Sequence, residues 1–247
     1  MQSKPIGIIG GTALEGLEGL KNTRTRSVTT PYGEPSSVLT YGEVNDAGIV
    51  FLNRHGAEHS IPPHLINYRA NIWALQEADV SRIVALASVG GITEKMGPGV
   101  LVIPDQLIDY TYGRRQTCFD ENFRVDRHID FTRPYGEPSR QWLIAAAAAA
   151  NEAVIDGGTY GCTQGPRLET AAEVKRMARD GCDIVGMTGM PEAALARELG
   201  IDYACFAMVV NWAAGVTEET ITIEDIRRVI ADSNDRLLRV LAKAFGI

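Results

Sequence analysis

The stretch from Asp183 to Asn211 constrains the fold more than any other part of the 247-residue chain. It contains a short apolar strand, a Gly-Met-Thr-Gly-Met-Pro-Glu turn, an alanine- and leucine-rich helix, and a second apolar strand that ends at Asn211. A strand that ends at Thr188, before a helix opened by Pro191, offers a hydroxyl and free backbone N–H groups to an anion. Because open α/β sheets bind ligands at this edge, the stretch predicts a ligand site between the turn and Asn211.

Strand and helix patterns alternate along most of the remaining sequence. The strand-like runs are residues 6–9, 37–44, 49–53, 83–87, 100–108 and 158–163, those at 37–44 and 49–53 forming a hairpin. The helix-like segments are residues 67–78, 140–152, 170–179 and 223 onward, the last with Thr222 as its N-cap. This alternation predicts one α/β domain over residues 1–247, with a central, mixed but largely parallel sheet flanked by helices.

The composition is that of an ordinary soluble protein, with 45% hydrophobic and 22% charged residues. A formal charge of -7 argues against a nucleic-acid partner, because binding the phosphate backbone requires clustered lysine and arginine. No apolar stretch has the length of a membrane span, so we predict a cytoplasmic protein without a membrane partner. The four cysteines lack CxxC spacing and are expected to be reduced, mostly buried thiols.

Anion-binding groups follow four of the predicted strands. They are Thr12 after two glycines, Arg54 with His55, Ser88 in a small-residue turn, and Thr188. Arginine offers an oxyanion a fork of donors, and histidine offers one more. Any one of these could be a plain turn, but four on the same sheet edge indicate a phosphate site. The sequence lacks a Walker motif, a G-x-S-x-G elbow and a metal-ligand pair, so free phosphate becomes the favoured substrate.

Five motifs resemble the trimeric purine nucleoside phosphorylase and 5'-methylthioadenosine phosphorylase family, in chain order over nearly the whole sequence. They are Gly10-Gly-Thr12, Asn53-Arg-His-Gly56, Asn67-Tyr-Arg-Ala-Asn-Ile-Trp73, Gly165-Pro-Arg-Leu-Glu169 and Met187-Thr-Gly-Met-Pro-Glu192. The resemblance implies phosphate ligands at Thr12, Arg54, His55, Ala87 (through its backbone), Ser88 and Thr188, with Met187 packed against the ribose. It also implies phosphate as co-substrate, no metal or other cofactor, and a homotrimer or a dimer of trimers.

The same resemblance assigns the purine to Glu169 and Asn211, with Asn211 and His55 as the catalytic candidates. Phosphorolysis leaves negative charge on the departing purine, and the Asn211 amide can both donate to it and accept from it. Family members that take 6-aminopurines have aspartates where this chain has Asn211 and Ala213. A carboxylate at Glu169 would accept the N1–H that a 6-oxopurine carries and adenine lacks. These residues therefore favour hypoxanthine or guanine as the base.

At the sugar end, Ile223 and Ile226 stand where nucleoside-type members place a histidine for the 5'-hydroxyl. An apolar wall suits a methylthio group and leaves a hydroxyl without a partner. Ile223 would otherwise be taken as a core residue, since its spacing is that of any amphipathic helix. His128, in the long loop at 109–138, resembles a histidine that a neighbouring subunit lends to this pocket. His59 and Trp212 complete the candidate substrate contacts.

Together, a 6-oxopurine site and an apolar 5' pocket predict phosphorolysis of S-methyl-5'-thioinosine to hypoxanthine and 5-methylthioribose 1-phosphate. The enzymatic alternatives are phosphorolysis of inosine or guanosine and phosphorolysis of 5'-methylthioadenosine. A non-catalytic nucleoside- or dinucleotide-binding domain is an alternative of a different class, although the full G-x-G-x-x-G spacing is missing.

Overall fold

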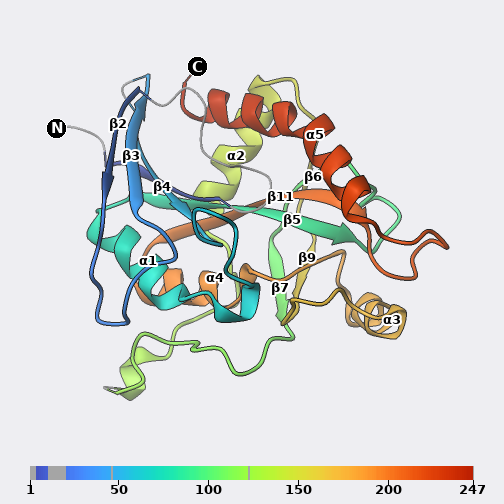
Figure 1. Ribbon diagram of the computed structural model, residues 1–247, viewed down its shortest axis with the longest axis horizontal. Helices are drawn as coiled ribbons and strands as arrows, with labels where there is room; N and C mark the ends of the chain where they lie inside the picture. Colours follow the sequence, from blue (N-terminus) through green and yellow to red (C-terminus); the bar gives the residue numbers. More distant parts are fainter. Residues whose placement is uncertain (1–3, 11–20, 46, 122, 247) are drawn as a thin grey trace.

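A computed structural model of the chain describes residues 4–10, 21–45, 47–121 and 123–246. Within these ranges, eleven strands form one mixed sheet with helices on both faces (Figure 1), which confirms the predicted fold class. The strands are β1 (Ile6–Gly10), β2 (Lys21–Arg26), β3 (Leu39–Val44), β4 (Ala47–Asn53), β5 (Arg82–Gly91), β6 (Leu101–Ile103), β7 (Gln106–Asp109), β8 (Val154–Asp156), β9 (Thr159–Cys162), β10 (Ile184–Gly186) and β11 (Asp202–Trp212). The helices are α1 (Tyr68–Glu77), α2 (Glu137–Ala149), α3 (Ala171–Asp180), α4 (Gly189–Glu198) and α5 (Ile223–Ala244), with 3-10 turns η1 (Pro63–Leu65) and η2 (Val125–Arg127).

Strand β5 is the branch point of the sheet. Along one edge, its first residues pair in parallel with β1, as far as Ala85 opposite Ile9. Further along, Gly90 and Gly91 pair with β10 in the antiparallel sense, while β11 follows β5 over its whole length. The segment 86–89 therefore lies where β1 and β10 diverge. Such a divergence of neighbouring strands is where open α/β sheets place their ligands.

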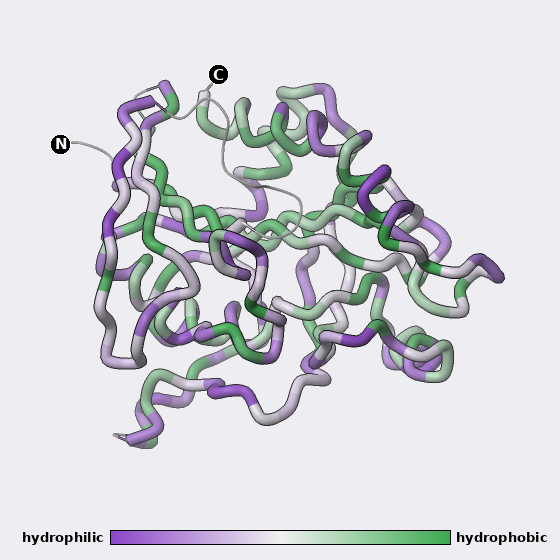
Figure 2. The backbone as a smooth tube through the Cα atoms, viewed as in Figure 1, coloured by the Kyte–Doolittle hydropathy of each residue, from purple (hydrophilic) through white to green (hydrophobic). Residues whose placement is uncertain are grey.

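The two faces of the sheet are covered by different helix pairs. On β11, Cys205, Ala207 and Val209 belong to one core cluster, which also contains buried residues of α1 and α4. Phe206 and Met208 point to the opposite face and pack with residues of α2 and α5. This alternation is the period-two pattern of a strand that is buried on both faces. Figure 2 shows the hydrophobic segments running along these central strands.

Threonine side chains cap the N-termini of α3 and α5. Thr222 accepts a hydrogen bond from the backbone N–H of Asp225, as predicted for the terminal helix, and Thr170 forms a reciprocal capping box with Glu173 at the start of α3. The predicted hairpin is confirmed by the antiparallel pairing of β3 with β4. None of the described helices is both long and apolar enough to cross a membrane.

The prediction of a turn at 88–91 is wrong, because β5 continues as a strand through Gly91. Pairing with β11 on one side and β10 on the other keeps this small-residue segment extended. A Cβ added to Gly91 would lie 1.7 Å from the Met96 carbonyl oxygen, so the glycine permits a close backbone approach rather than a chain reversal.

Candidate active site

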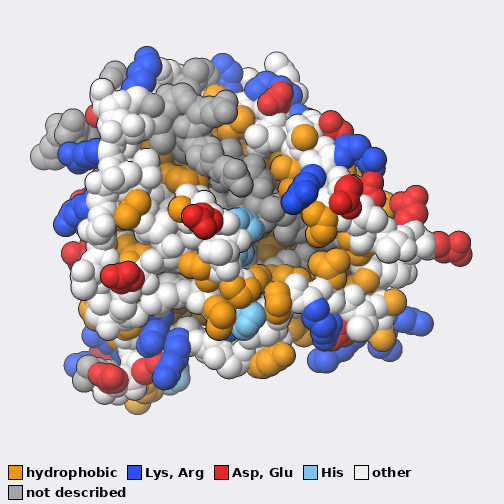
Figure 3. Space-filling model, in the orientation of Figure 1, with side chains coloured by type: hydrophobic (Ala, Val, Ile, Leu, Met, Phe, Trp, Pro, Cys, Tyr) orange, Lys and Arg blue, Asp and Glu red, His pale blue; other side chains and the backbone are white. Residues whose placement is uncertain are grey.

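A cleft of about 490 Å³ opens where β1 and β10 diverge along β5. Its lining includes most of the residues that the sequence placed in the site: Arg54, His55, His59, Ala87, Ser88, Glu169, Met187, Thr188, Asn211, Ala213, Ile223 and Ile226. Figure 3 shows this side of the molecule, with histidine side chains near the centre among hydrophobic ones. Thr12 lies outside the described residues.

The floor of the cleft carries hydroxyl groups suited to an oxyanion. Ser88 Oγ is buried and has no hydrogen-bond partner among the described residues. Thr188 occupies the N-cap position of α4, yet its side chain makes no capping bond there. A buried hydroxyl without a partner costs free energy, so a ligand that accepts from Ser88 is favoured here. The position of α4 behind Thr188 adds the partial positive charge of a helix N-terminus.

Arg54 is buried beside the cleft, with 2% of its surface exposed, and is bound to a carboxylate that the sequence analysis did not anticipate. Its Nε and Nη2 each donate to Glu192 at 2.8 Å, while Nη1 donates to the Leu86 carbonyl oxygen at 2.9 Å. Tyr203 donates a further bond of 2.8 Å to Glu192. The fork predicted for phosphate is therefore directed at Glu192, because a buried guanidinium needs a countercharge. Two of its five N–H groups remain for a ligand.

His55 is almost completely buried and is held by one backbone contact. Its Nδ1 lies 2.8 Å from the Ile61 carbonyl oxygen, so Nδ1–H donates and Nε2 is left as an acceptor in the neutral ring. Burial and the neighbouring Arg54 lower the pKa of His55 to about 4. The additional donor predicted from the sequence thus requires protonation at Nε2, which a bound anion would favour. The ring of His59 lies 4.5 Å from that of His55 between centroids.

The pKa of His55 predicts a specific loss of stability in acid. The folded state holds the ring neutral down to pH of about 4, whereas the unfolded state binds its proton near pH 6.5. Stability from this group is therefore complete above pH 6.5 and falls by about 3 kcal/mol as the pH approaches 4. We expect His55→Asn, which keeps a donor for Ile61, to flatten the pH dependence of the urea midpoint over this range. The unchanged protein is the reference, and an equal slope in His55→Asn would contradict the assignment.

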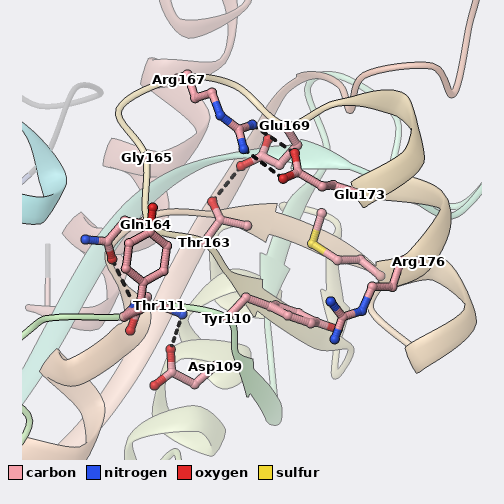
Figure 4. Close-up of a pocket in the computed structure, with 12 residues that line it drawn as sticks. Asp109, Tyr110, Thr111, Thr163, Gln164, Gly165, Arg167, Glu169, Glu173 and Arg176 are labelled. Carbon is pink, nitrogen blue, oxygen red and sulfur yellow. Dashed lines mark hydrogen bonds and ion pairs between the residues drawn. The ribbon is translucent and has the colours of Figure 1, made fainter.

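Glu169 and Asn211, the residues predicted to bind the base, both line the cleft. Glu169 accepts a 2.6 Å hydrogen bond from Thr163 Oγ1 at the end of β9, which fixes one carboxylate oxygen (Figure 4). Asn211 Nδ2 donates to the Trp212 carbonyl oxygen at 2.7 Å and keeps one N–H free. A β-bulge between Val209 and Asn211 lies immediately before this asparagine. Glu169 also borders a second hollow of about 390 Å³, which contains Arg167 and Arg176.

The sugar end of the cleft is apolar, and more extensively than the sequence indicated. Ile223 and Ile226 are joined in the lining by Ile221 and Ile230. Ile230 follows Ile226 at a helical i, i+4 spacing, so the helical pattern itself contained this signal. Ile223 is 57% exposed, which contradicts its alternative interpretation as a core residue. Arg227, also missed, is a charged residue of α5 in the cleft lining.

Two predicted contacts lie away from the cleft. Trp212 lines another hollow of about 460 Å³, and its ring would face a Cβ placed on Gly97 at 3.2 Å. Asn211 lines this hollow as well as the cleft, so the end of β11 borders both, whereas Trp212 is not part of the cleft lining. His128 is exposed beside η2, where its ring stacks edge-on with Phe123 at 5.1 Å between centroids. Within one chain, His128 does not belong to the lining of the cleft.

A cleft whose lining combines hydroxyl groups, a carboxylate, an amide and an apolar wall of isoleucines defines an α/β protein with a nucleoside-and-anion site. Residues 5–245 match the model of the phosphorylase superfamily, and the chain belongs to this family. This assignment confirms the family predicted from the five motifs.

Similar proteins come from bacteria, archaea and animals. The chain is 51% identical over 239 residues to a probable S-methyl-5'-thioinosine phosphorylase from Pseudomonas syringae pv. tomato, with 97% of each chain covered. It is 44% identical over 247 residues to a 6-oxopurine nucleoside phosphorylase from Pyrococcus furiosus, covering 98% of this chain and 92% of that protein. Its structure resembles a methylthioadenosine phosphorylase from Schistosoma mansoni in complex with adenine, with a TM-score of 0.91, 32% identity, and coverage of 99% and 91%.

Proposed function

We propose that the protein catalyses the phosphorolysis of S-methyl-5'-thioinosine to hypoxanthine and 5-methylthioribose 1-phosphate. One observation carries the proposal: a single cleft joins Glu169 and Asn211 at one end to the isoleucine wall of α5 at the other. The relative from Pseudomonas syringae, with half of its aligned residues identical, has a name that supports the same substrate. Phosphate is the co-substrate, and the proposal includes no metal or other cofactor.

In the proposed reaction, phosphate lies against residues 86–88 of β5, within reach of Ser88 and Thr188. The bond between ribose C1' and purine N9 breaks as a bond forms from a phosphate oxygen to C1', and the bonding electron pair leaves with the purine. Positive charge that develops on C1' is stabilised by the dianion beneath it, while the free N–H of Asn211 stabilises the purine. Preorganised donors of this kind act only as the charge develops, so they lower the barrier.

The base preference follows from the acceptor at Glu169. Thr163 occupies one carboxylate oxygen, and the other is left to accept N1–H of a 6-oxopurine. Adenine presents a lone pair at N1, so it would leave this carboxylate without a donor. A site that must hydrogen-bond a substrate group discriminates strongly against an analogue without that group.

A phosphorolysis panel tests the proposal directly. With phosphate present, methylthioinosine should be cleaved with a higher kcat/KM than methylthioadenosine, inosine or adenosine, and without phosphate none should be cleaved. Faster cleavage of methylthioadenosine would overturn the assigned base preference. Inosine turnover equal to that of methylthioinosine would favour a 6-oxopurine nucleoside phosphorylase, like the Pyrococcus furiosus relative. Binding without phosphate-dependent cleavage would indicate a non-catalytic nucleoside-binding protein.

Ile226 offers a separate test of the 5' pocket. Replacing this half-buried side chain with serine removes apolar surface that would contact the methylthio group. We expect kcat/KM for methylthioinosine to fall about tenfold, with little change for inosine, because a lost methylene contact is worth about 1–3 kcal/mol. Val229→Ser is a matched control on the same helix, since Val229 lines a different hollow. Equal losses for both nucleosides would contradict the assignment of this wall to the 5' substituent.

We further propose a cytoplasmic homotrimer, or a dimer of such trimers, in which His128 reaches the cleft of a neighbouring subunit. The support is the exposure of His128 in a long loop, together with Leu168 and Ile223, which are exposed apolar residues of the cleft lining. The four buried, unpaired cysteines fit a reducing compartment. Sedimentation analysis should give the mass of three or six chains, and a monomer at assay concentrations would contradict the assembly.

A further inference from the structure

We propose that Arg114 is a positioning residue that holds together the two turns carrying the purine and ribose contacts. It lies in the loop after β7 and is not part of the cleft lining, so it would act without touching the substrate. The proposal rests on the function proposed above, because it assigns a role in that same site.

Every N–H group of the Arg114 guanidinium is directed at one of three segments of the chain. Nε donates to Gln164 Oε1 at 3.1 Å, and Nη2 donates to the carbonyl oxygens of Thr163 and Gln164 at 3.2 and 2.8 Å. Nη1 donates to the carbonyl oxygens of Met187 and Met190 at 2.9 and 2.5 Å. It also lies 3.1 Å from the Tyr68 hydroxyl, and the guanidinium carbon is 5.3 Å from the centre of that ring.

The two turns that Arg114 joins carry the substrate contacts. The first follows β9 and contains Thr163, whose hydroxyl orients Glu169. The second follows β10 and contains Met187, which lines the cleft, as well as Thr188. Beyond the paired strands, a backbone bond of 2.8 Å from Thr163 N to the Gly186 carbonyl oxygen also links these turns. Arg114 adds a bond to each turn from one rigid group, so it fixes the distance between Glu169 and Met187.

The chemistry of this contact requires arginine. Carbonyl oxygens at strand ends lack ladder partners, and burying them without donors costs free energy. Carbonyl oxygens of Thr163, Gln164 and Met187, which follow strand ends, converge on Arg114 together with that of Met190 in the first turn of α4. A planar guanidinium has five donors in a fixed fork and can reach both turns at once, whereas a lysine ammonium has three donors around one point. Arg114→Lys should therefore fail to restore the geometry although it keeps the charge.

The neighbouring Arg115 provides a matched control. It is exposed, and its Nη1 donates to Asp120 at 3.3 Å. We would compare Arg114→Ala, Arg114→Lys and Arg115→Ala with the unchanged protein, measuring KM for methylthioinosine and for phosphate separately. We expect both Arg114 variants to lose about 10²-fold in kcat/KM for the nucleoside, the loss that a displacement of about 1 Å causes. KM for phosphate should rise less, because Thr188 lies on the second turn but Ser88 is held on β5. Arg115→Ala should stay within about twofold.

Rescue distinguishes a positioning role from a general loss of folding. Millimolar guanidinium or methylguanidinium should restore part of the nucleoside KM in Arg114→Ala and leave Arg115→Ala unaffected, while circular dichroism establishes the folded fraction. Equal rises in both KM values, unchanged kinetics in Arg114→Ala, or a loss fully explained by the unfolded fraction would overturn the inference. Failure of the proposed function is distinguishable, because the unchanged protein would then not cleave methylthioinosine.

Discussion

Glu192→Gln is expected to destabilise the protein and weaken phosphate binding together. The carboxylate is fully buried and binds Arg54 through both oxygens, with Tyr203 as a third donor. A neutral amide leaves the Arg54 charge buried without compensation and turns one acceptor into a donor facing a donor. Breaking a buried ion pair from one side costs about 3–5 kcal/mol. The urea midpoint should fall accordingly, and KM for phosphate should rise because Arg54 no longer keeps its place beside β5.

A second arginine–glutamate pair in the same chain provides the control. Arg167 also binds Glu173 through two 2.8 Å hydrogen bonds, from Nη1 and Nη2 rather than from Nε and Nη2, but both partners are exposed. Exposed ion pairs contribute little, and glutamine can still complete the capping box at this helix start. Glu173→Gln should therefore lose only a small fraction of the stability that Glu192→Gln loses. Similar losses in both variants, or an unchanged phosphate KM in Glu192→Gln, would contradict the role of the buried pair.

The order of the elements was predictable because it depends on local patterns. The hairpin at β3 and β4, the cap at Thr222 and the alternation of strands with helices are each specified within a few neighbouring residues. The turn predicted at the small residues of β5 was wrong because the interactions that decide this segment are not local. Gly90 and Gly91 have the composition of a turn, yet pairing with β10 and β11 keeps them extended. That pairing is a property of the assembled sheet, which no local pattern contains.

Most residues that line the cleft were predictable by type, but their hydrogen-bond partners were not. Arg54 and Glu192 are 138 residues apart in the chain, so spacing gives no indication that they meet. The sequence-based prediction therefore gave all the N–H donors of Arg54 to phosphate, although a buried charge must first be balanced within the protein. Trp212 shows the opposite difficulty: it neighbours Asn211 in sequence and shares a second hollow with it, but only Asn211 of the two also lines the cleft. The β-bulge before Asn211 disturbs the alternation of side chains there, and a bulge depends on the pairing of β11 with β5 rather than on a local pattern.

Asn211→Asp is expected to change which purine the cleft accepts. The asparagine keeps one N–H free beyond its bond to the Trp212 carbonyl oxygen, and a 6-oxopurine can accept from it. An aspartate can only accept, so it would repel the lone pairs at O6 and N7 and leave the departing base without a donor. Removing a donor of this kind costs about 10²–10³ in kcat. We expect a loss of this size for methylthioinosine and a smaller one for methylthioadenosine, whose 6-amino group can donate to the new carboxylate.

The same substitution at an exposed position separates this effect from the added charge. Asn151 lies in the turn after α2 at a φ of 54°, which asparagine and aspartate both tolerate, so Asn151→Asp changes the net charge equally and leaves the cleft intact. For each variant, we would measure the ratio of the initial rates with methylthioinosine and methylthioadenosine at saturating phosphate. If this ratio moves toward the aminopurine only in Asn211→Asp, the free amide N–H selects the base. If it stays unchanged while Glu169→Gln alters it, the carboxylate held by Thr163 selects the base and Asn211 serves only the departing charge.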